Sequence, residues 1–153
     1  MKIGIIGKGF VGSAVSNGFN VDVEQFVVDP AYTSNTIEEL VEYSPPLTFI
    51  CVPTPPNEDG SINVDIVQDV LIELSMRDYK GVCVIKSTII PDYLHQFKKE
   101  FDLKIVYNPE FLTEAKAAQD FIDPNMQVLG GKWKDCDTVE KAYNRYSDVR
   151  VVP

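Results

Sequence analysis

Short apolar runs alternate with amphipathic stretches along most of this chain. The apolar runs are continuous rather than alternating, and they cover residues 2–7, 24–29, 47–52, 81–86, 103–108 and 126–131. Continuous runs of this length are typical of strands that a parallel sheet buries on both faces. Because crossovers between parallel strands are right-handed, few arrangements of such strands and helices remain. The pattern therefore predicts a single α/β domain with a doubly wound, Rossmann-like parallel sheet.

Helices are predicted between these runs. Asn63 is a candidate N-cap for a helix that would bury Ile66, Val67, Val70, Leu71 and Leu74. Residues 91–101 begin with a proline and place Leu94, Phe97 and Phe101 at helical spacing. Residues 134–146 form another, mostly polar candidate. The last apolar run, residues 148–152, predicts a further edge strand.

Composition narrows the class of ligand. The chain has 153 residues, which fits one domain, and its 44% hydrophobic and 24% charged residues are typical of a globular protein. A net charge of −9 argues against a nucleic-acid or acidic membrane surface, since both require clustered Lys and Arg. A small anionic ligand stays open, because backbone N–H groups at a helix start hold phosphate without net positive charge.

The cysteines suggest neither a metal site nor a disulfide framework. Cys51, Cys83 and Cys136 show no CxxC spacing and no accompanying set of histidines. Cys51 and Cys83 lie in apolar runs, where a buried structural thiol is the favoured interpretation. The apolar run at the N-terminus is too short for a signal peptide, and no stretch approaches a membrane span. We therefore expect a cytoplasmic protein.

A glycine motif follows the first predicted strand. Gly7, Gly9 and Gly12 form a G-x-G-x-x-G pattern at the start of a helix, where they would allow a tight turn, close approach of a pyrophosphate and close helix packing. The second predicted strand ends in Asp29, a position where an acidic side chain accepts hydrogen bonds from an adenosine ribose. By itself Asp29 could simply open the turn that follows. With the glycines, a dinucleotide site is favoured, and the carboxylate selects NAD over NADP.

Prolines and polar residues gather where the later strands end, in "CVPTPPNEDGS", "KSTIIP" and "YNPEFLTEA". Ligands of open α/β sheets bind at this edge. Each segment also has an ordinary structural interpretation. Thr88 could end a strand or cap a helix, and Glu110 could interact with a helix dipole. Glu110 and Glu114 stand four apart, so on a helix both would project from one face near its first turn. For such a pair alone, a solvated helix face is the favoured interpretation.

Taken together, the segments "GxGxVG", "VPTP" followed by "DGS", "KSTIIP" and "NPEFLTEAKAAQDF" resemble the N-terminal domain of the UDP-glucose/GDP-mannose dehydrogenase family. The resemblance covers nearly the whole chain, and "NPEFLTE" after "KST" is its most specific part. Members of this family oxidise the C6 alcohol of a nucleotide sugar to a carboxylate in two NAD-dependent steps. The reaction passes through a covalent thiohemiacetal and a thioester on a cysteine.

The resemblance assigns roles to individual residues. Asp29 would bind the adenosine ribose, and Thr88 would help to hold the hydrolytic water. Glu110 would assist proton transfer during thioester hydrolysis, and Glu114 would approach both the sugar and NAD. The remaining cofactor residues would be Gly7, Gly9, Phe10, Val11, Gly12, Val52, Pro53, Thr54, Pro55 and Ser87, and Thr88 would also lie beside NAD. The sugar would be held by the segment Glu110, Phe111, Leu112, Thr113 and Glu114.

The chain also departs from the family. It has no "GGxCFPKD"-like motif for the nucleophilic cysteine, and Cys136 in "KDCDT" has the wrong setting. The lysine and asparagine that the family places on a long central helix are absent too. The segment between Asp29 and Leu47 is short, so we expect one strand-helix unit after the second strand to be missing. The sheet order would then be 2-1-3-4-5-6.

Alternative functions follow from these departures. The chain could be the NAD-binding half of a nucleotide-sugar dehydrogenase, as a fragment or with the cysteine domain supplied by a second polypeptide. It could instead be a non-catalytic dinucleotide-binding module, such as a remnant or a regulator. A different dehydrogenase with a similar glycine motif is a more distant alternative. In either of the first two cases, an uncovered apolar C-terminal end or an edge strand would favour a homodimer.

Overall fold

The computed structural model describes residues 1–19, 22–143 and 151–152, and among them it forms a parallel sheet with helices on both faces. The sheet contains β1 (Lys2–Ile6), β2 (Glu24–Val28), β3 (Leu47–Ile50), β4 (Val82–Ile85) and β5 (Lys104–Tyr107). Their order is β2-β1-β3-β4-β5, and every neighbouring pair is parallel. All residues of β3 and β4 are buried, as their continuous apolar sequences predict. The predicted doubly wound α/β fold is confirmed.

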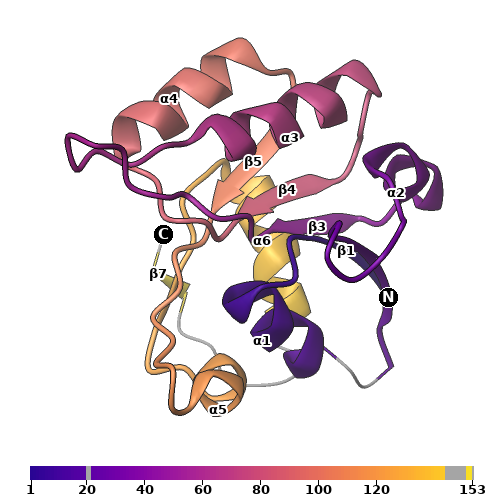
Figure 1. The fold of residues 1–153 in the computed structure, drawn as a ribbon. Coiled ribbons are helices and arrows are strands. Elements are labelled where there is room, and N and C mark those ends of the chain that lie inside the picture. The colour runs from indigo at the N-terminus through magenta and orange to yellow at the C-terminus, as the bar shows by residue number, and fades with distance from the viewer. Residues whose placement is uncertain (20–21, 144–150, 153) are drawn as a thin grey trace.

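Two layers of helices cover the sheet (Figure 1). On one face α1 (Phe10–Gly18) and α6 (Trp133–Tyr143) contribute to one apolar cluster, together with Phe121 of the short helix α5 (Ala117–Ile122). On the other face α2 (Ile37–Tyr43), α3 (Asp65–Met76) and α4 (Pro91–Glu100) contribute to a second cluster. The loops at the carboxyl ends of the strands are left uncovered between these layers, and this is where the candidate site lies.

The helix predictions are confirmed except in detail. The N-cap of α3 is Val64, so the predicted cap at Asn63 is one residue off, although the Asn63 amide oxygen accepts a hydrogen bond from the Asp65 N–H at 2.9 Å. Val67, Val70, Leu71 and Leu74 are buried, but Ile66 is 40% exposed and its predicted burial is wrong. Ile66 lies off the buried face of the helix, because it stands one residue before the buried Val67 and three before the exposed Asp69. In α4, Phe97 is buried, whereas Leu94 and Phe101 are partly buried.

The predicted place of the sixth strand is wrong. The short strand β6 (Gln127–Val128) pairs in parallel with β7 (Val151–Val152) instead of extending the main sheet. In the described residues, the apolar run that contains β6 pairs with the main sheet at one antiparallel bridge. There Gly130 and Tyr107 exchange two hydrogen bonds of 2.8 Å. The carbonyl of Val128 accepts a hydrogen bond from the Asn108 side chain at 2.9 Å. At Val128 the Asn108 side chain therefore forms the hydrogen bond that a neighbouring strand would form in a sheet. The predicted strand at residues 148–152 is seen at its last two positions, and residues 148–150 lie outside the described residues.

The short segment after β2 explains the strand order. It contains α2, whose N-cap Thr36 accepts from the Glu39 N–H while the Glu39 carboxylate accepts from the Thr36 N–H. The chain then crosses to β3 on the other side of β1, so β2 is left as an edge strand among the described residues. In this order the direction of winding reverses between β1 and β3, and ligands of open α/β sheets bind at that point. None of the helices in the described ranges is long and apolar enough to cross a membrane.

Candidate functional site

The glycine loop between β1 and α1 has the geometry that its sequence predicts. Gly7 has φ +89°, and a Cβ there would lie 2.8 Å from the backbone oxygen of Cys51. A Cβ at Gly12 would lie 1.9 Å from the oxygen of Gly7, so the start of α1 rests directly on the loop. A Cβ at Gly9, by contrast, would meet nothing within 4 Å. The loop therefore leaves open space above Gly9, where a ligand can approach the backbone.

Asp29 connects the end of β2 to this loop. Its Oδ2 accepts a hydrogen bond from the Lys8 N–H at 2.6 Å, and its Oδ1 accepts from the Ala31 N–H at 2.8 Å. Its backbone oxygen accepts from the Tyr32 N–H at 3.0 Å, so Asp29 also opens the turn that the sequence suggests. Each carboxylate oxygen has two acceptor sites, so the carboxylate can still accept from a ligand hydroxyl.

A pocket of about 490 Å³ lies between the glycine loop and the loops after β3 and β4. We call it the glycine-loop pocket. It brings together segments that are distant in sequence, because the carboxyl ends of parallel strands meet at one edge of the sheet. Its lining residues are Gly7, Gly9, Phe10, Val11, Asp29, Ala31, Tyr32, Cys51, Val52, Pro53, Thr54, Lys86, Ser87, Thr88 and Glu110.

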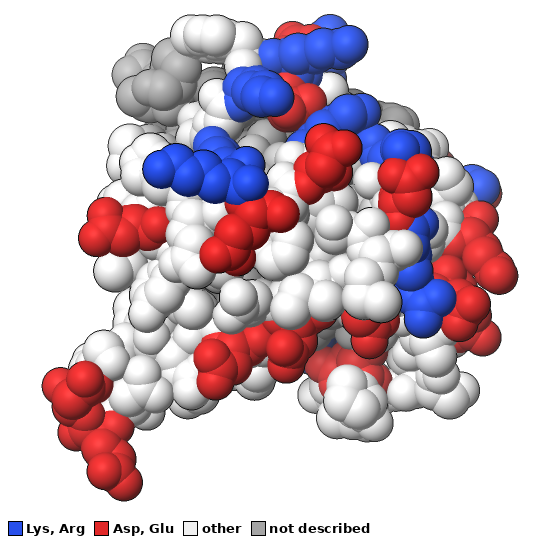
Figure 2. Space-filling model, turned by 90° about the horizontal axis from the view of Figure 1, so that it is seen from above, with Lys and Arg blue, Asp and Glu red and all other residues white. Residues whose placement is uncertain are grey.

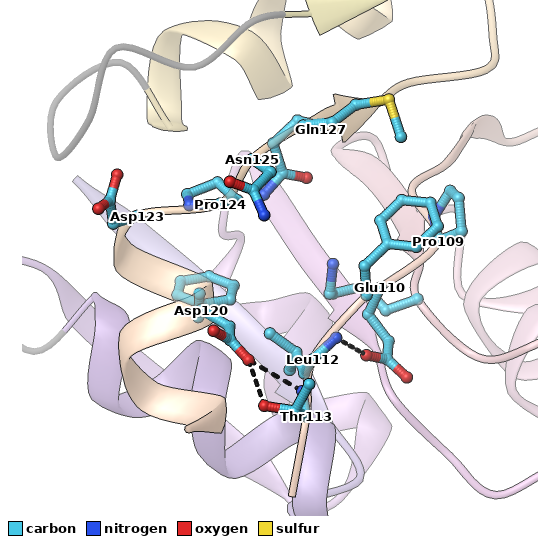
Figure 3. Close-up of a pocket in the computed structure, with 13 residues that line it drawn as sticks. Pro109, Glu110, Leu112, Thr113, Asp120, Asp123, Pro124, Asn125 and Gln127 are labelled. Atoms are coloured by element: carbon cyan, nitrogen blue, oxygen red, sulfur yellow. Dashed lines mark hydrogen bonds between the residues drawn. The ribbon is translucent and has the colours of Figure 1, made fainter. Parts of the chain in front are cut away.

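A second pocket, of about 300 Å³, lies beside it between the segment after β5 and α5 (Figure 3). We call it the α5 pocket. Glu110, Leu112 and Thr113 line one side, and Asp120, Pro124 and Asn125 line the other. The Thr113 N–H and hydroxyl both donate to Oδ2 of Asp120, at 3.0 and 2.7 Å. This double contact joins the segment after β5 to α5.

The helical arrangement considered for Glu110 and Glu114 is wrong. Residues 108–113 form no helix or strand, and α5 begins only at Ala117. Oε2 of Glu110 accepts from the Leu112 N–H at 2.6 Å, which turns the chain locally and takes the place of a helix start. As a result Glu110 lines both pockets, whereas Glu114 lies beside α1 in a shallow groove with Phe10 and Ser13.

Lys86 is a site residue that the sequence analysis missed. It directly follows β4, it is 2% exposed, and it lines both pockets. Its ammonium donates to the Asn108 backbone oxygen at 3.3 Å and to the Asn108 side-chain oxygen at 3.0 Å. Burial lowers the pKa of Lys86 to about 8, although the nearby Cys51 and Glu110 act in the opposite direction. A lysine at the end of a fully apolar run was a signal in the sequence, since lysine is almost never fully buried unless it is paired.

Asn108 organises the buried polar groups around Lys86. Its amide donates to Oε1 of Gln127 and to the Val128 carbonyl, both at 2.9 Å, and its side-chain oxygen also accepts from the Tyr143 hydroxyl. This places Lys86 in a network that reaches from β5 to β6 and α6.

Comparison with known proteins shows the family to which this chain belongs. Residues 22–147 match the UDP-glucose/GDP-mannose dehydrogenase family, NAD binding domain. The chain belongs to this family. A UDP-glucose 6-dehydrogenase of Haloferax volcanii is 26% identical over 97% of this chain and 44% of its own length. A UDP-glucose 6-dehydrogenase of Rickettsia felis is 34% identical over 60% of this chain and 22% of its own length.

Solved structures of dehydrogenases share the fold of this family domain. A GDP-mannose dehydrogenase from Pseudomonas aeruginosa has a TM-score of 0.80 at 20% identity, over 99% of this chain and 46% of that chain. A UDP-glucose dehydrogenase from Pyrobaculum islandicum has a TM-score of 0.78 at 21% identity, over 99% of this chain and 45% of that chain. This chain therefore spans less than half the length of these proteins. The alignment with the Haloferax protein runs over 194 positions, so that protein carries residues that this chain lacks.

As an NAD-binding domain, the chain holds most of the predicted cofactor residues around one pocket. Ser87 and Thr88 are both there, but only Thr88 is exposed. The Ser87 hydroxyl donates to the Val52 carbonyl at 2.6 Å and so ties the loop after β4 to the loop after β3. Gly12 is buried beneath the loop, and Pro55 and Glu114 lie outside the lining of the glycine-loop pocket.

The three cysteines of this family member are all buried. Burial raises the pKa of Cys51 and of Cys83 to about 12, and it also raises the pKa of Cys136. Because the thiolate is the nucleophilic form, none of these thiols is set up for covalent catalysis. Cys51 and Cys83 have the structural role that the sequence predicts.

Proposed function

We propose that this chain is the cofactor half of a nucleotide-sugar 6-dehydrogenase, and that the sugar lies in the α5 pocket next to NAD. The observation that carries the proposal is the common wall of the two pockets, to which Lys86 and Glu110 both contribute. A dehydrogenase must hold its substrate against the nicotinamide, so adjoining cofactor and substrate pockets are what this chemistry requires. UDP-glucose and GDP-mannose are the sugar nucleotides named for the relatives.

In this proposal the glycine loop holds the pyrophosphate and Asp29 holds the adenosine ribose. The nicotinamide then reaches the opposite end of the glycine-loop pocket, near Pro53, Thr54 and Thr88. Thr88 is exposed there and can hold a water molecule, while Glu110 can move a proton between that water and the reacting carbon. The segment Glu110–Thr113 would contact the sugar, and Glu114 would contribute from the neighbouring groove.

The nucleophilic cysteine would come from outside these residues, because Cys51, Cys83 and Cys136 are buried with raised pKa values. We propose that a second polypeptide supplies it, or that the complete protein does. A homodimer and a cytoplasmic location, where NAD is available, are part of the same proposal. The apolar C-terminal surface expected from the sequence comprises residues 149–153, of which 149, 150 and 153 lie outside the described residues.

Calorimetric titration with NAD and NADP tests the cofactor assignment. We expect NAD to bind more tightly, because the Asp29 carboxylate would repel a 2′-phosphate. Equal affinities, or tighter binding of NADP, would contradict the role given to Asp29. Titration with UDP-glucose and GDP-mannose in the presence of NADH then tests the α5 pocket. If NAD binds while neither sugar nucleotide does, the non-catalytic dinucleotide-binding module becomes the better description.

A further inference from the structure

Lys86 is a buried cation whose charge the protein leaves uncompensated. Among the described residues no carboxylate lies within 4 Å of its ammonium, although the side chain is only 2% exposed. Its hydrogen bonds go to the two neutral oxygens of Asn108. An unpaired buried charge is unfavourable for folding, so a lysine retained at such a place is expected to act on something that enters the site.

The groups around Lys86 do not supply the missing negative charge at close range. Cys51, after β3, is a neutral thiol, because burial raises its pKa to about 12. Tyr143 of α6 shares the Asn108 oxygen with Lys86, and burial also raises the pKa of its hydroxyl. Phe121 of α5 places its ring centroid 6.0 Å from the ammonium.

Carboxylates are present only farther away. Glu110, after β5, lies beyond 4 Å and uses Oε2 to accept from the Leu112 N–H. Asp120 and Asp123 line the far side of the α5 pocket, and Asp120 is engaged by Thr113. Glu110 reduces the field of Lys86 in both pockets but does not neutralise it at short range.

The cofactor changes its charge at this end of the site. With the adenosine ribose at Asp29, the nicotinamide lies at the end of the glycine-loop pocket that Lys86 lines, an orientation that rests on the proposed function. The ring of NAD⁺ carries a positive charge, and it loses this charge when C4 accepts a hydride. A buried ammonium nearby therefore repels the oxidised ring and leaves the reduced ring unaffected.

We propose that Lys86 makes this site bind NADH in preference to NAD⁺, and thereby makes bound NAD⁺ a stronger hydride acceptor. The two statements are linked by a thermodynamic cycle, because tighter binding of the product form raises the reduction potential of the bound couple. For this two-electron couple, a tenfold preference for NADH corresponds to about 30 mV. Lys86 is thus a specificity-determining residue for the redox state of the cofactor.

The test compares NAD⁺, NADH and ADP-ribose binding to the wild-type chain, Lys86→Met and Lys99→Met at pH 7. ADP-ribose shares the adenosine and diphosphate but lacks the nicotinamide, and Lys99 is exposed on α4. In wild type and Lys99→Met we expect NADH to bind at least about fivefold more tightly than NAD⁺. In Lys86→Met this ratio should fall to near one while the affinity for ADP-ribose stays unchanged. A ratio unaffected by Lys86→Met would overturn the proposal.

A second measurement keeps the test decisive if Lys86→Met does not fold. The preference of the wild-type chain for NADH should decline as the pH rises from 7 to above the pKa of about 8 that burial gives Lys86, because the ammonium then loses its charge. Lys86→Arg should retain the preference throughout this range. A preference that is constant with pH in both proteins overturns the proposal. If ADP-ribose binds but NAD⁺ and NADH bind equally, only the role of Lys86 fails, whereas absence of all binding removes the cofactor site itself.

Discussion

Asp29 has a structural role in the glycine loop, and the proposed function adds a role in binding the cofactor. Its carboxylate accepts from the Lys8 and Ala31 N–H groups and also lines the glycine-loop pocket. Asp29→Ala should weaken NAD binding by about 1.5–3 kcal/mol, the range for hydrogen bonds to charged groups, and should narrow the difference between NAD and NADP. Calorimetric titration measures both effects, with the exposed Asp102→Ala as the control. Unchanged NAD affinity in Asp29→Ala would show that the carboxylate only holds the loop.

Lys86 should also make the free energy of unfolding depend on pH. Its pKa falls from 10.5 to about 8 on folding, because burial disfavours the charged form. Because the pKa is lower in the folded state, the protein loses stability as the pH falls from the unfolded-state pKa of 10.5 toward the folded-state pKa of about 8. Wild type should therefore gain stability relative to Lys86→Met between pH 8 and 10.5, by an amount on the order of 3 kcal/mol. Urea unfolding at several pH values measures this difference, with Lys99→Met as the control. A constant difference across this interval would argue that Lys86 is not buried as a cation.

Single residues differ in how far the sequence could predict them. The roles of Gly7 and Gly12 follow from their spacing after a strand, since the motif acts through local backbone geometry. Lys86 and Asn108 could not be paired from the sequence, because they meet only when β4 and β5 lie side by side. The position of Asp29 was predictable, but its bonds to Lys8 and Ala31 depend on how the loop closes.

At the level of elements, the glycine loop and α1 offer a matched pair of substitutions. Gly9→Ala adds a methyl group where nothing lies within 4 Å, so the fold should change little in stability, by about 1 kcal/mol or less. The same methyl would occupy the space above the loop, so NAD binding should weaken at least about tenfold. Gly12→Ala places a Cβ 1.9 Å from the Gly7 oxygen and should destabilise the domain by several kcal/mol, about 3 or more. Thermal unfolding and NAD titration of both variants separate the two effects. Equal loss of stability in the two variants would contradict this division of roles.

The central strands were predictable as elements, and the segments after β5 were not. Strands such as β3 and β4 are apolar throughout because both of their faces are covered, and this pattern can be recognised in the sequence alone. The run around β6 has similar composition, but in the described residues it meets the main sheet through side-chain hydrogen bonds from Asn108 and one antiparallel bridge instead of a strand ladder. The segment from Glu110 to Thr113 has no regular secondary structure, and the carboxylates of Glu110 and Asp120 accept hydrogen bonds from its backbone N–H groups at Leu112 and Thr113. Both outcomes depend on contacts between distant residues.

For the whole molecule, the net charge of −9 decides how a dinucleotide can be held. On the face shown in Figure 2, acidic side chains lie among the lysines and arginines, so this face presents no continuous basic surface in its described part. The diphosphate must therefore be bound by local groups rather than by the overall field. The glycine loop and the start of α1 can supply these groups, because free N–H groups at a helix start carry partial positive charge. The affinity for the dinucleotide should then depend only weakly on the salt concentration.

The isolated chain should not convert a nucleotide sugar to its acid, even with NAD in excess. The second oxidation requires a thiolate, and a pKa of about 12 leaves about one in ten thousand of the Cys51 or Cys83 thiols ionised at pH 8. Positioning of the substrate against the nicotinamide is worth about 7–11 kcal/mol, and the α5 pocket supplies only part of the enclosure. The formation of NADH with UDP-glucose measures this directly. Steady production by the isolated chain would refute the prediction.

Complementation tests the other side of the same prediction. A polypeptide that carries the cysteine domain of a family member should restore NADH formation when it is mixed with this chain. In the restored enzyme, Glu110→Gln should slow hydrolysis of the acyl-enzyme more than its formation, because the proposed function gives Glu110, which lines both pockets, the proton transfer during hydrolysis. Rapid-mixing kinetics separate the two steps, and Glu58→Gln in the exposed loop after β3 is the matched control. An equal effect of Glu110→Gln on both steps would assign this carboxylate to substrate binding instead of proton transfer.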